Sequence, residues 1–209
     1  MKLSLVERMP EALRESAITQ NVARGQRLFR RGDRAGYLYL IQQGRFQEVS
    51  YPEEGRMAVL QILNAGSTLG ETGLFNQVYR STAIAQINSQ VIAYPLSVLK
   101  EQLQRSPLVM ETLIEILSQK IYEFQVRLEW RSISLADRRV LEYLKHQLEK
   151  VSQNRDTTTT LTLNTPLQEI AAELGFVPGT LSRALAKLEA EQTIQREDNR
   201  ITLLDTDVA

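Results

Sequence analysis

The chain has 209 residues, of which 43 % are hydrophobic and 24 % are charged, and its formal net charge is zero. These values are ordinary for a folded globular protein and exclude a mainly disordered chain. The chain has no cysteine, which excludes disulfides, thiolate metal sites and cysteine nucleophiles. It shows neither a secretory signal nor the roughly 18 apolar residues that a membrane-spanning helix needs. We therefore expect a soluble, cytoplasmic protein with no membrane partner.

The first half of the chain changes character near residue 22. Residues 1–20 carry loosely periodic apolar positions, from Leu5 to Ile18, and are predicted to form a short helix. Residues 22–94 hold eight of the ten glycines, which separate short apolar or alternating runs. Such runs at regular spacing predict a small roll of short strands. The runs are 37–41, 57–60, 84–87 and 91–94.

Two helices are predicted next, the first opened by Pro95 and the second by Pro107. The second helix carries apolar residues at intervals of 4, 3, 4, 3 and 4, which is a heptad seam. The seam consists of Met110, Ile114, Leu117, Ile121, Phe124 and Leu128. A second apolar face, including Val109 and Val126, would allow the helix to pack on its own roll and on a partner together. The seam predicts a parallel homodimer; the alternative is a helix packed only on its own roll.

A break at Ile133 and Ser134 precedes a third helix, for which Ser134 is the predicted N-cap. Residues 152–160 are polar and predict a loop, and residues 161–163 predict a short strand. The following segment, residues 165–190, contains two short apolar-striped helices. Thr165, Pro166 and Gln168 fit a capping box at the start of the first helix, and Gly175 supplies its left-handed end.

Pro178 opens the second short helix, and two short helices joined by a glycine turn are typical of a helix-turn-helix. The alternative is an ordinary helical hairpin. Residues 193–203 then predict a strand, a polar turn and a strand, which is a wing. Polar and exposed positions of this motif are the candidate DNA-contacting residues, with arginine and hydroxyl side chains suited to base edges and lysine to phosphate. They are Gln168, Pro178, Gly179, Thr180, Ser182, Arg183 and Lys187.

The charge of this segment is poor for DNA binding, in which phosphate neutralisation dominates affinity. Residues 160–209 contain four basic and eight acidic side chains, a net charge of −4. Helix N-termini and polar donors are therefore expected to supply some phosphate contacts. Arg138, Arg139 and Lys145 are expected to add others.

Three local patterns, in order and at matching distances from Gly25 to Leu203, resemble the Crp/Fnr family of catabolite activator protein-like bacterial transcription regulators. They are Gly25, Leu28-Phe29, Gly32-Asp33, Leu38-Tyr39 and Gly44; Gly70-Glu71-Thr72-Gly73-Leu74-Phe75 with Arg80-Ser81-Thr82-Ala83; and Gly179-Thr180-Leu181-Ser182-Arg183.

The resemblance implies an α+β chain with a cyclic-nucleotide-binding-type β-roll, a long dimerisation helix and a winged helix-turn-helix. The predicted domains are 1–106, 107–133 and 134–209. It also implies a homodimer that binds a palindromic operator in double-stranded DNA and acts with RNA polymerase. The family often has glutamate where this chain has Gly179, so its half-site should differ from the usual one.

The second pattern resembles the family's phosphate-binding cassette, which implies cyclic AMP or another cyclic nucleotide as effector. By that resemblance Glu71 would accept from a ribose hydroxyl, while Arg80 and Ser81 would bind the phosphate. Gly70, Thr72 and Gln125 on the long helix complete the candidate site. The structural alternative is a buried Glu71–Arg80 ion pair. Haem sensing is not expected, because the sole histidine, His146, lies outside the roll on a predicted exposed helix position.

Three other functional hypotheses remain. One is a cyclic-nucleotide sensor whose acidic helix-turn-helix contacts protein, and another is a regulator that needs no effector. The third is an enzyme, but no GxxxxGK[ST], HExxH or GxSxG motif occurs and one histidine leaves little acid–base chemistry. We predict no catalytic residue and no metal site.

Overall fold

The computed structural model of the protein describes residues 10–51, 57–152 and 159–204. The chain divides into two compact units, Met1–Ile121 and Tyr122–Ala209. The boundary between them falls within one helix, α5 (Pro107–Ser132). No helix in the described residues is long and apolar enough to cross a membrane.

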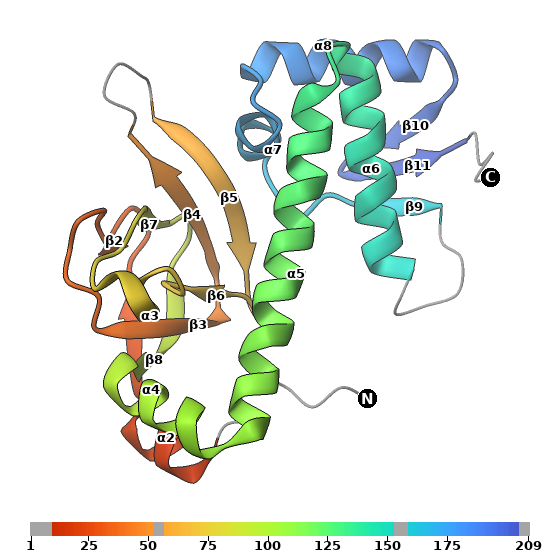
Figure 1. Cartoon of the computed structure of the whole chain (residues 1–209). Helices are drawn as coiled ribbons and strands as arrows, with labels where there is room; N and C mark the ends of the chain where they lie inside the picture. The colour runs from red at the N-terminus through yellow and green to blue at the C-terminus, as the bar shows by residue number, and fades with distance from the viewer. Residues whose placement is uncertain (1–9, 52–56, 153–158, 205–209) are drawn as a thin grey trace. The chain divides into compact units, whose positions relative to one another are not determined.

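The first unit is built on two four-stranded antiparallel sheets (Figure 1). One sheet has the order β1 (Ile18–Val22), β8 (Ser89–Pro95), β3 (Tyr37–Gln43) and β6 (Thr68–Leu69). The other has the order β2 (Arg27–Phe29), β7 (Thr82–Ala85), β4 (Arg45–Ser50) and β5 (Ala58–Asn64). This confirms the predicted β-roll.

One apolar core joins the two sheets of the roll. Ile41 of β3 and Phe46 of β4 are at most 1 % exposed, and the ring of Phe29 stacks on that of Tyr79 at 4.0 Å. Between β3 and β4 the chain turns at Gly44, where φ is +100° and a Cβ atom would lie 2.7 Å from the Cα atom of Ser89. The turn therefore depends on glycine.

Helices close one end of the roll. A second apolar cluster joins α2 (Glu11–Ser16), α3 (Gly73–Asn76), α4 (Leu96–Arg105) and the start of α5 to strands of the first sheet. Val109 of α5 is 1 % exposed in this cluster, beside Leu13, which is fully buried. The predicted packing of one apolar face of α5 on the roll is thus confirmed for its first turns.

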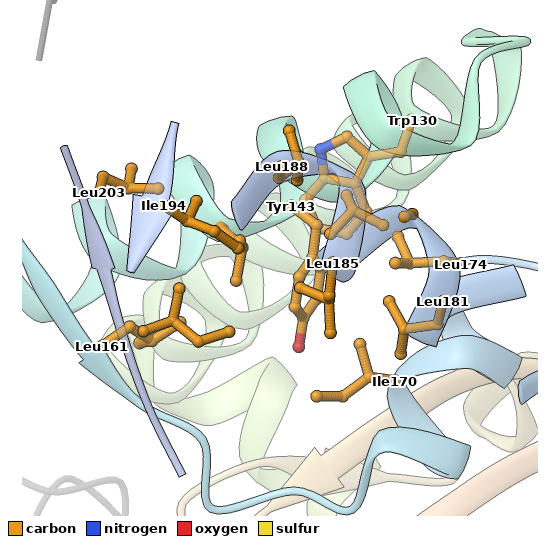
Figure 2. Close-up of a cluster of buried hydrophobic side chains, with 14 of the residues drawn as sticks. Trp130, Tyr143, Leu161, Ile170, Leu174, Leu181, Leu185, Leu188, Ile194 and Leu203 are labelled. Atoms are coloured by element: carbon orange, nitrogen blue, oxygen red, sulfur yellow. The ribbon is translucent and has the colours of Figure 1, made fainter. Parts of the chain in front are cut away.

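The second unit contains the rest of α5 and a three-helix, three-stranded domain. Its sheet has the order β10, β11, β9. Figure 2 shows its core, in which Trp130 of α5 and Tyr143 pack edge to face at 5.3 Å among leucines and isoleucines. The elements are α6 (Ala136–Ser152), β9 (Thr160–Thr162), α7 (Leu167–Glu173), α8 (Pro178–Ala190), β10 (Ile194–Glu197) and β11 (Arg200–Leu203).

Several predicted boundaries were wrong. The helix predicted over residues 1–20 ends at Ser16 in the described part, because Ile18 begins a strand that pairs with β8. The run 84–87 is a strand only to Ala85. Ser134 is not an N-cap: α6 begins at Ala136, and the Leu135 carbonyl accepts the first helical hydrogen bond, from Arg139. Residues 1–9 of the predicted first helix and residues 153–158 of the predicted polar loop lie outside the described residues.

Candidate functional site

The helix-turn-helix of the second unit consists of α7 and α8. The turn runs through Gly175, whose φ is +74° as its predicted left-handed role requires, and the Phe176 amide donates to the Ala171 carbonyl at 2.7 Å. Pro178 occupies the first position of α8, as predicted. The predicted capping box at Thr165 was wrong, since α7 begins one residue later than it requires. Pro166 is the N-cap residue, and no side chain caps the helix.

One side of α8 is buried and the other is exposed. Four residues of the helix, Leu181, Ala184, Leu185 and Leu188, are at most 5 % exposed and pack in the domain core (Figure 2). The predicted contact residues lie away from this stripe: all are exposed except Thr180, which is half-buried, and all belong to α8 except Gln168 of α7. The motif therefore presents a polar surface from the N-terminal turns of α8.

Arg183 and Lys187 are held differently on this surface. The Arg183 guanidinium donates to the Gly179 carbonyl at 3.1 Å and to the Thr180 hydroxyl at 3.4 Å, both uncharged acceptors. The Lys187 ammonium pairs with the carboxylate of Asp137 on α6 and lies 3.7 Å from that of Glu191. The hydrogen bond from Lys187 lowers the pKa of Asp137. The charge of the Lys187 ammonium is therefore partly neutralised before it meets any phosphate.

Arg139, which was expected to contact phosphate, is bound by backbone carbonyls of its own domain. Its guanidinium donates to the carbonyls of Ile133 and Leu174, both at 3.0 Å, and lies 4.6 Å from the ring centroid of Phe176. Burial lowers the pKa of this guanidinium. Arg139 thus fastens the end of α5 and the turn of the motif to α6.

A buried ion pair that the sequence did not reveal joins α5 to α7. Arg127 Nε lies 3.1 Å from Glu173 Oε1, and each side chain is 9 % exposed. Glu123 lies 3.6 Å from the same guanidinium. The one feature of the sequence that could have indicated this pair is Glu173, a charged residue beside the apolar stripe of α7. The pair therefore holds α7, the first helix of the helix-turn-helix, against α5.

In the first unit, the candidate effector residues are placed by the β6–α3 turn and the start of β7. Gly70 has a φ of +90°, and a Cβ atom there would lie 3.1 Å from the Tyr37 carbonyl, so the turn favours glycine. Glu71 accepts a hydrogen bond from Thr68 and pairs with the Lys120 ammonium of α5 at 2.7 Å. The structural alternative of a Glu71–Arg80 pair was therefore wrong.

The other candidate effector residues differ in exposure and in hydrogen-bond partner. Arg80 is exposed and donates to Asn76 Oδ1 at 3.4 Å, and Thr72 is exposed. Ser81 is 4 % exposed, and its hydroxyl donates to the carboxylate of Glu48, a residue that sequence reasoning missed. Gln125 is exposed on the part of α5 that belongs to the second unit.

All six residues of the predicted seam on α5 are exposed. Their exposed fractions range from 38 % for Leu117 to 68 % for Leu128. The buried apolar residues of the same helix lie in the two cores: Val109 in that of the first unit, and Val126 and Trp130 in that of the second. Large apolar side chains in an exposed row are typical of an interaction surface.

The prediction that His146 is exposed was wrong. The side chain is buried at 8 % exposure, and its ring lies 5.3 Å from that of Trp130. Burial lowers its pKa. Within the described residues, no three histidine, aspartate or glutamate side chains are grouped as a metal site would require.

Comparison with known proteins accounts for both units. Residues 19–106 match the family model of the cyclic nucleotide-binding domain, and residues 138–208 match that of the Crp-like helix-turn-helix domain. The chain is 23 % identical over 184 residues to the fumarate and nitrate reduction regulatory protein of Vibrio cholerae, covering 88 % of this chain and 74 % of that one. It is 23 % identical over 183 residues to the transcriptional activator protein FnrA of Stutzerimonas stutzeri, covering 88 % and 75 %.

Solved structures show the same fold. The structure of FixK2 from Bradyrhizobium japonicum matches with a TM-score of 0.74 at 18 % identity, over 90 % of this chain and 93 % of that one. A CooA mutant from Carboxydothermus hydrogenoformans matches with a TM-score of 0.77 at 17 % identity, over 91 % and 85 %.

A cyclic-nucleotide-binding-type roll followed by a Crp-like helix-turn-helix defines a class of DNA-binding transcription regulators. Within that class, this chain belongs to the Crp/Fnr family. The members of this family bind DNA and act as dimers.

Proposed function

We propose that this regulator binds a palindromic operator as a homodimer and places one α8 helix in the major groove of each half-site. The observation that carries the proposal is the exposed polar surface at the N-terminal turns of α8, around Gly179, Ser182 and Arg183. Helix-turn-helix proteins read base edges from this part of the second helix. A symmetric dimer meets two half-sites, so the operator repeats its sequence in inverted order.

Within each half-site, Arg183 is the residue proposed to read sequence. A guanidinium matches the O6 and N7 acceptors of guanine, and Ser182 and Thr180 supply shorter donors. Gly179 has no side chain and cannot read a base edge. The base pair opposite it is therefore expected to be weakly specified.

The proposed dimer forms through the seam on α5, from Met110 to Leu128. Its occupant is a second copy of this chain, because an exposed heptad seam is complementary to itself in a parallel two-helix arrangement. RNA polymerase is the further partner that we propose for a regulator of this kind. Because the operator is chromosomal DNA, we propose that the protein acts in the bacterial cytoplasm.

Selection of binding sites from random double-stranded DNA tests the proposal. The wild-type protein should enrich an inverted repeat whose half-sites are centred about one helical turn apart. Arg183→Ala should lose this enrichment, whereas Arg105→Ala, which removes an exposed arginine of α4, should keep it. If the wild type enriches no sequence and captures no DNA, the acidic second unit acts through protein contacts instead, and the proposal fails.

A further inference from the structure

The roll contains a half-buried carboxylate held by two buried donors. Glu48 on β4 accepts a hydrogen bond from the Ser81 hydroxyl and another from the Gln61 side-chain amide. Ser81 is 4 % exposed and Gln61 is 2 % exposed. Strand pairing sets this geometry, since Glu48 lies directly opposite Gln61 in the β4–β5 ladder. Buried donors without an acceptor are costly, so the buried Ser81 hydroxyl is stabilised by its bond to Glu48.

A second carboxylate is bound at the start of the cassette. Glu71 accepts from Thr68 and pairs with Lys120 at 2.7 Å, and Lys120 also donates to the Thr68 carbonyl at 2.7 Å. The Glu71 side chain is 10 % exposed and that of Lys120 is 15 % exposed. The Lys120 ammonium is thus already paired with a carboxylate of the cassette.

These contacts have a consequence for any anionic ligand of the roll. A cyclic nucleotide carries a phosphate monoanion, and the buried Ser81 hydroxyl that would donate to it already donates to Glu48. A phosphate bound by Ser81 would have to displace the half-buried Glu48 carboxylate or lie beside it, and like charges at close range repel. The Arg80 guanidinium is exposed and its partner is the uncharged Asn76.

We propose that Glu48 is the specificity-determining residue of this roll. Its carboxylate occupies, from within the protein, the place that an anionic phosphate would take, so that the native roll excludes cyclic nucleotides. The inference rests on the proposed function in treating the roll as the sensing part of a DNA-binding regulator. It implies that operator binding by the native protein needs no cyclic nucleotide.

Calorimetric titration of the full chain with cyclic AMP and with cyclic GMP tests the inference. The wild type should show no saturable heat. Glu48→Gln, which keeps the size and an acceptor oxygen but removes the charge, and Glu48→Ala should both give saturable heat with at least one of the two nucleotides. Glu101→Gln removes an exposed carboxylate of α4 and should leave the wild-type result unchanged.

The gained binding should depend on the phosphate. Adding Arg80→Leu or Ser81→Ala to the Glu48 variant that binds should abolish its heat. Thermal melting checks that each variant is folded. If Glu48→Ala does not fold, the titration of Glu48→Gln alone tests the inference. Saturable binding by the wild type would overturn the inference, as would the absence of any gain in the folded Glu48 variants. The titration contains no DNA, so it tests nucleotide binding separately from operator binding. A wild type that fails to bind operator overturns the proposed function but does not affect the titration result.

Discussion

Arg183 and Lys187 lie one helical turn apart on α8, and their partners set what each can do. Arg183 contacts two uncharged oxygen atoms on its own helix, which it can exchange for a base edge without breaking an ion pair. Lys187 is paired with Asp137, so its net attraction for phosphate is reduced by the carboxylate it leaves. Sequence discrimination is therefore expected from Arg183 and a weaker, general attraction from Lys187.

Arg183→Ala should weaken operator binding and relax the preference for one base pair in each half-site. A bidentate contact to guanine contributes about 1–3 kcal/mol of discrimination, and a symmetric dimer makes it twice, so the loss is roughly 2–6 kcal/mol. Fluorescence anisotropy on operator and scrambled DNA measures it. Lys187→Ala is the matched comparison: it should weaken binding to both DNAs and lower the salt slope by about 1 for each phosphate that the protein no longer neutralises. Unchanged preference in Arg183→Ala would remove this residue from the readout.

His146 predicts how the stability of the protein depends on pH. Burial lowers its pKa below the ordinary 6.5, so the unfolded chain binds the proton more readily than the folded one. The stabilisation is complete above pH 6.5 and is lost as the pH falls through the folded pKa. Urea unfolding at a series of pH values should show this loss in the wild type and a smaller one in His146→Gln, which does not titrate. Equal slopes in both proteins would exclude His146 as the cause.

At the scale of elements, the success of the predictions depended on whether the determining contacts are local. Pro178, the leucine stripe of α8 and Gly175 are signals within a few residues of each other, and both helices of the motif were found. The first strand was missed because Ile18 pairs with Ala93, a partner 75 residues away. The same reason hid the cassette contacts: Glu48 meets Ser81 across strands, and Lys120 reaches Glu71 from a separate helix.

Removing one partner of the ion pair between α5 and α7 should cost more stability than removing one partner of an exposed pair. Glu173→Gln leaves the buried Arg127 charge with Glu123 at 3.6 Å, and the expected cost is on the order of 3 kcal/mol in the free energy of unfolding. Urea unfolding measures it. Glu129→Gln, which removes an exposed carboxylate of α5, should cost less than about 0.5 kcal/mol in the same measurement.

A double variant tests whether charge burial is the cause. Arg127→Met with Glu173→Leu removes both charges and fills their volume with apolar atoms, so it should recover most of the stability that Glu173→Gln forfeits. If the double variant is no more stable than Glu173→Gln, packing rather than the lost charge pairing explains the effect.

For the whole molecule, a net charge of zero and a C-terminal segment of net −4 leave little general attraction to DNA. Affinity must then come from a few specific contacts, and each contact is doubled only if two copies bind together. Linking two half-site contacts through one dimer raises the effective concentration of the second contact once the first is made. Operator binding by this protein is therefore expected to depend steeply on dimerisation, which depends on the exposed seam of α5.

Leu117→Glu places a charge in the middle of that seam. In a parallel dimer the two new carboxylates would face each other without partners, at a cost on the order of 3–5 kcal/mol. Sedimentation should give the 23.8 kDa monomer instead of twice that mass, and operator affinity should fall with it. Ser118→Glu adds the same charge at the next exposed position, outside the seam, and should remain dimeric. Thermal melting should show that the roll and the helix-turn-helix stay folded in both variants, because Leu117 is not part of either core. A Leu117→Glu protein that sediments as a dimer would place the interface on another surface of the chain.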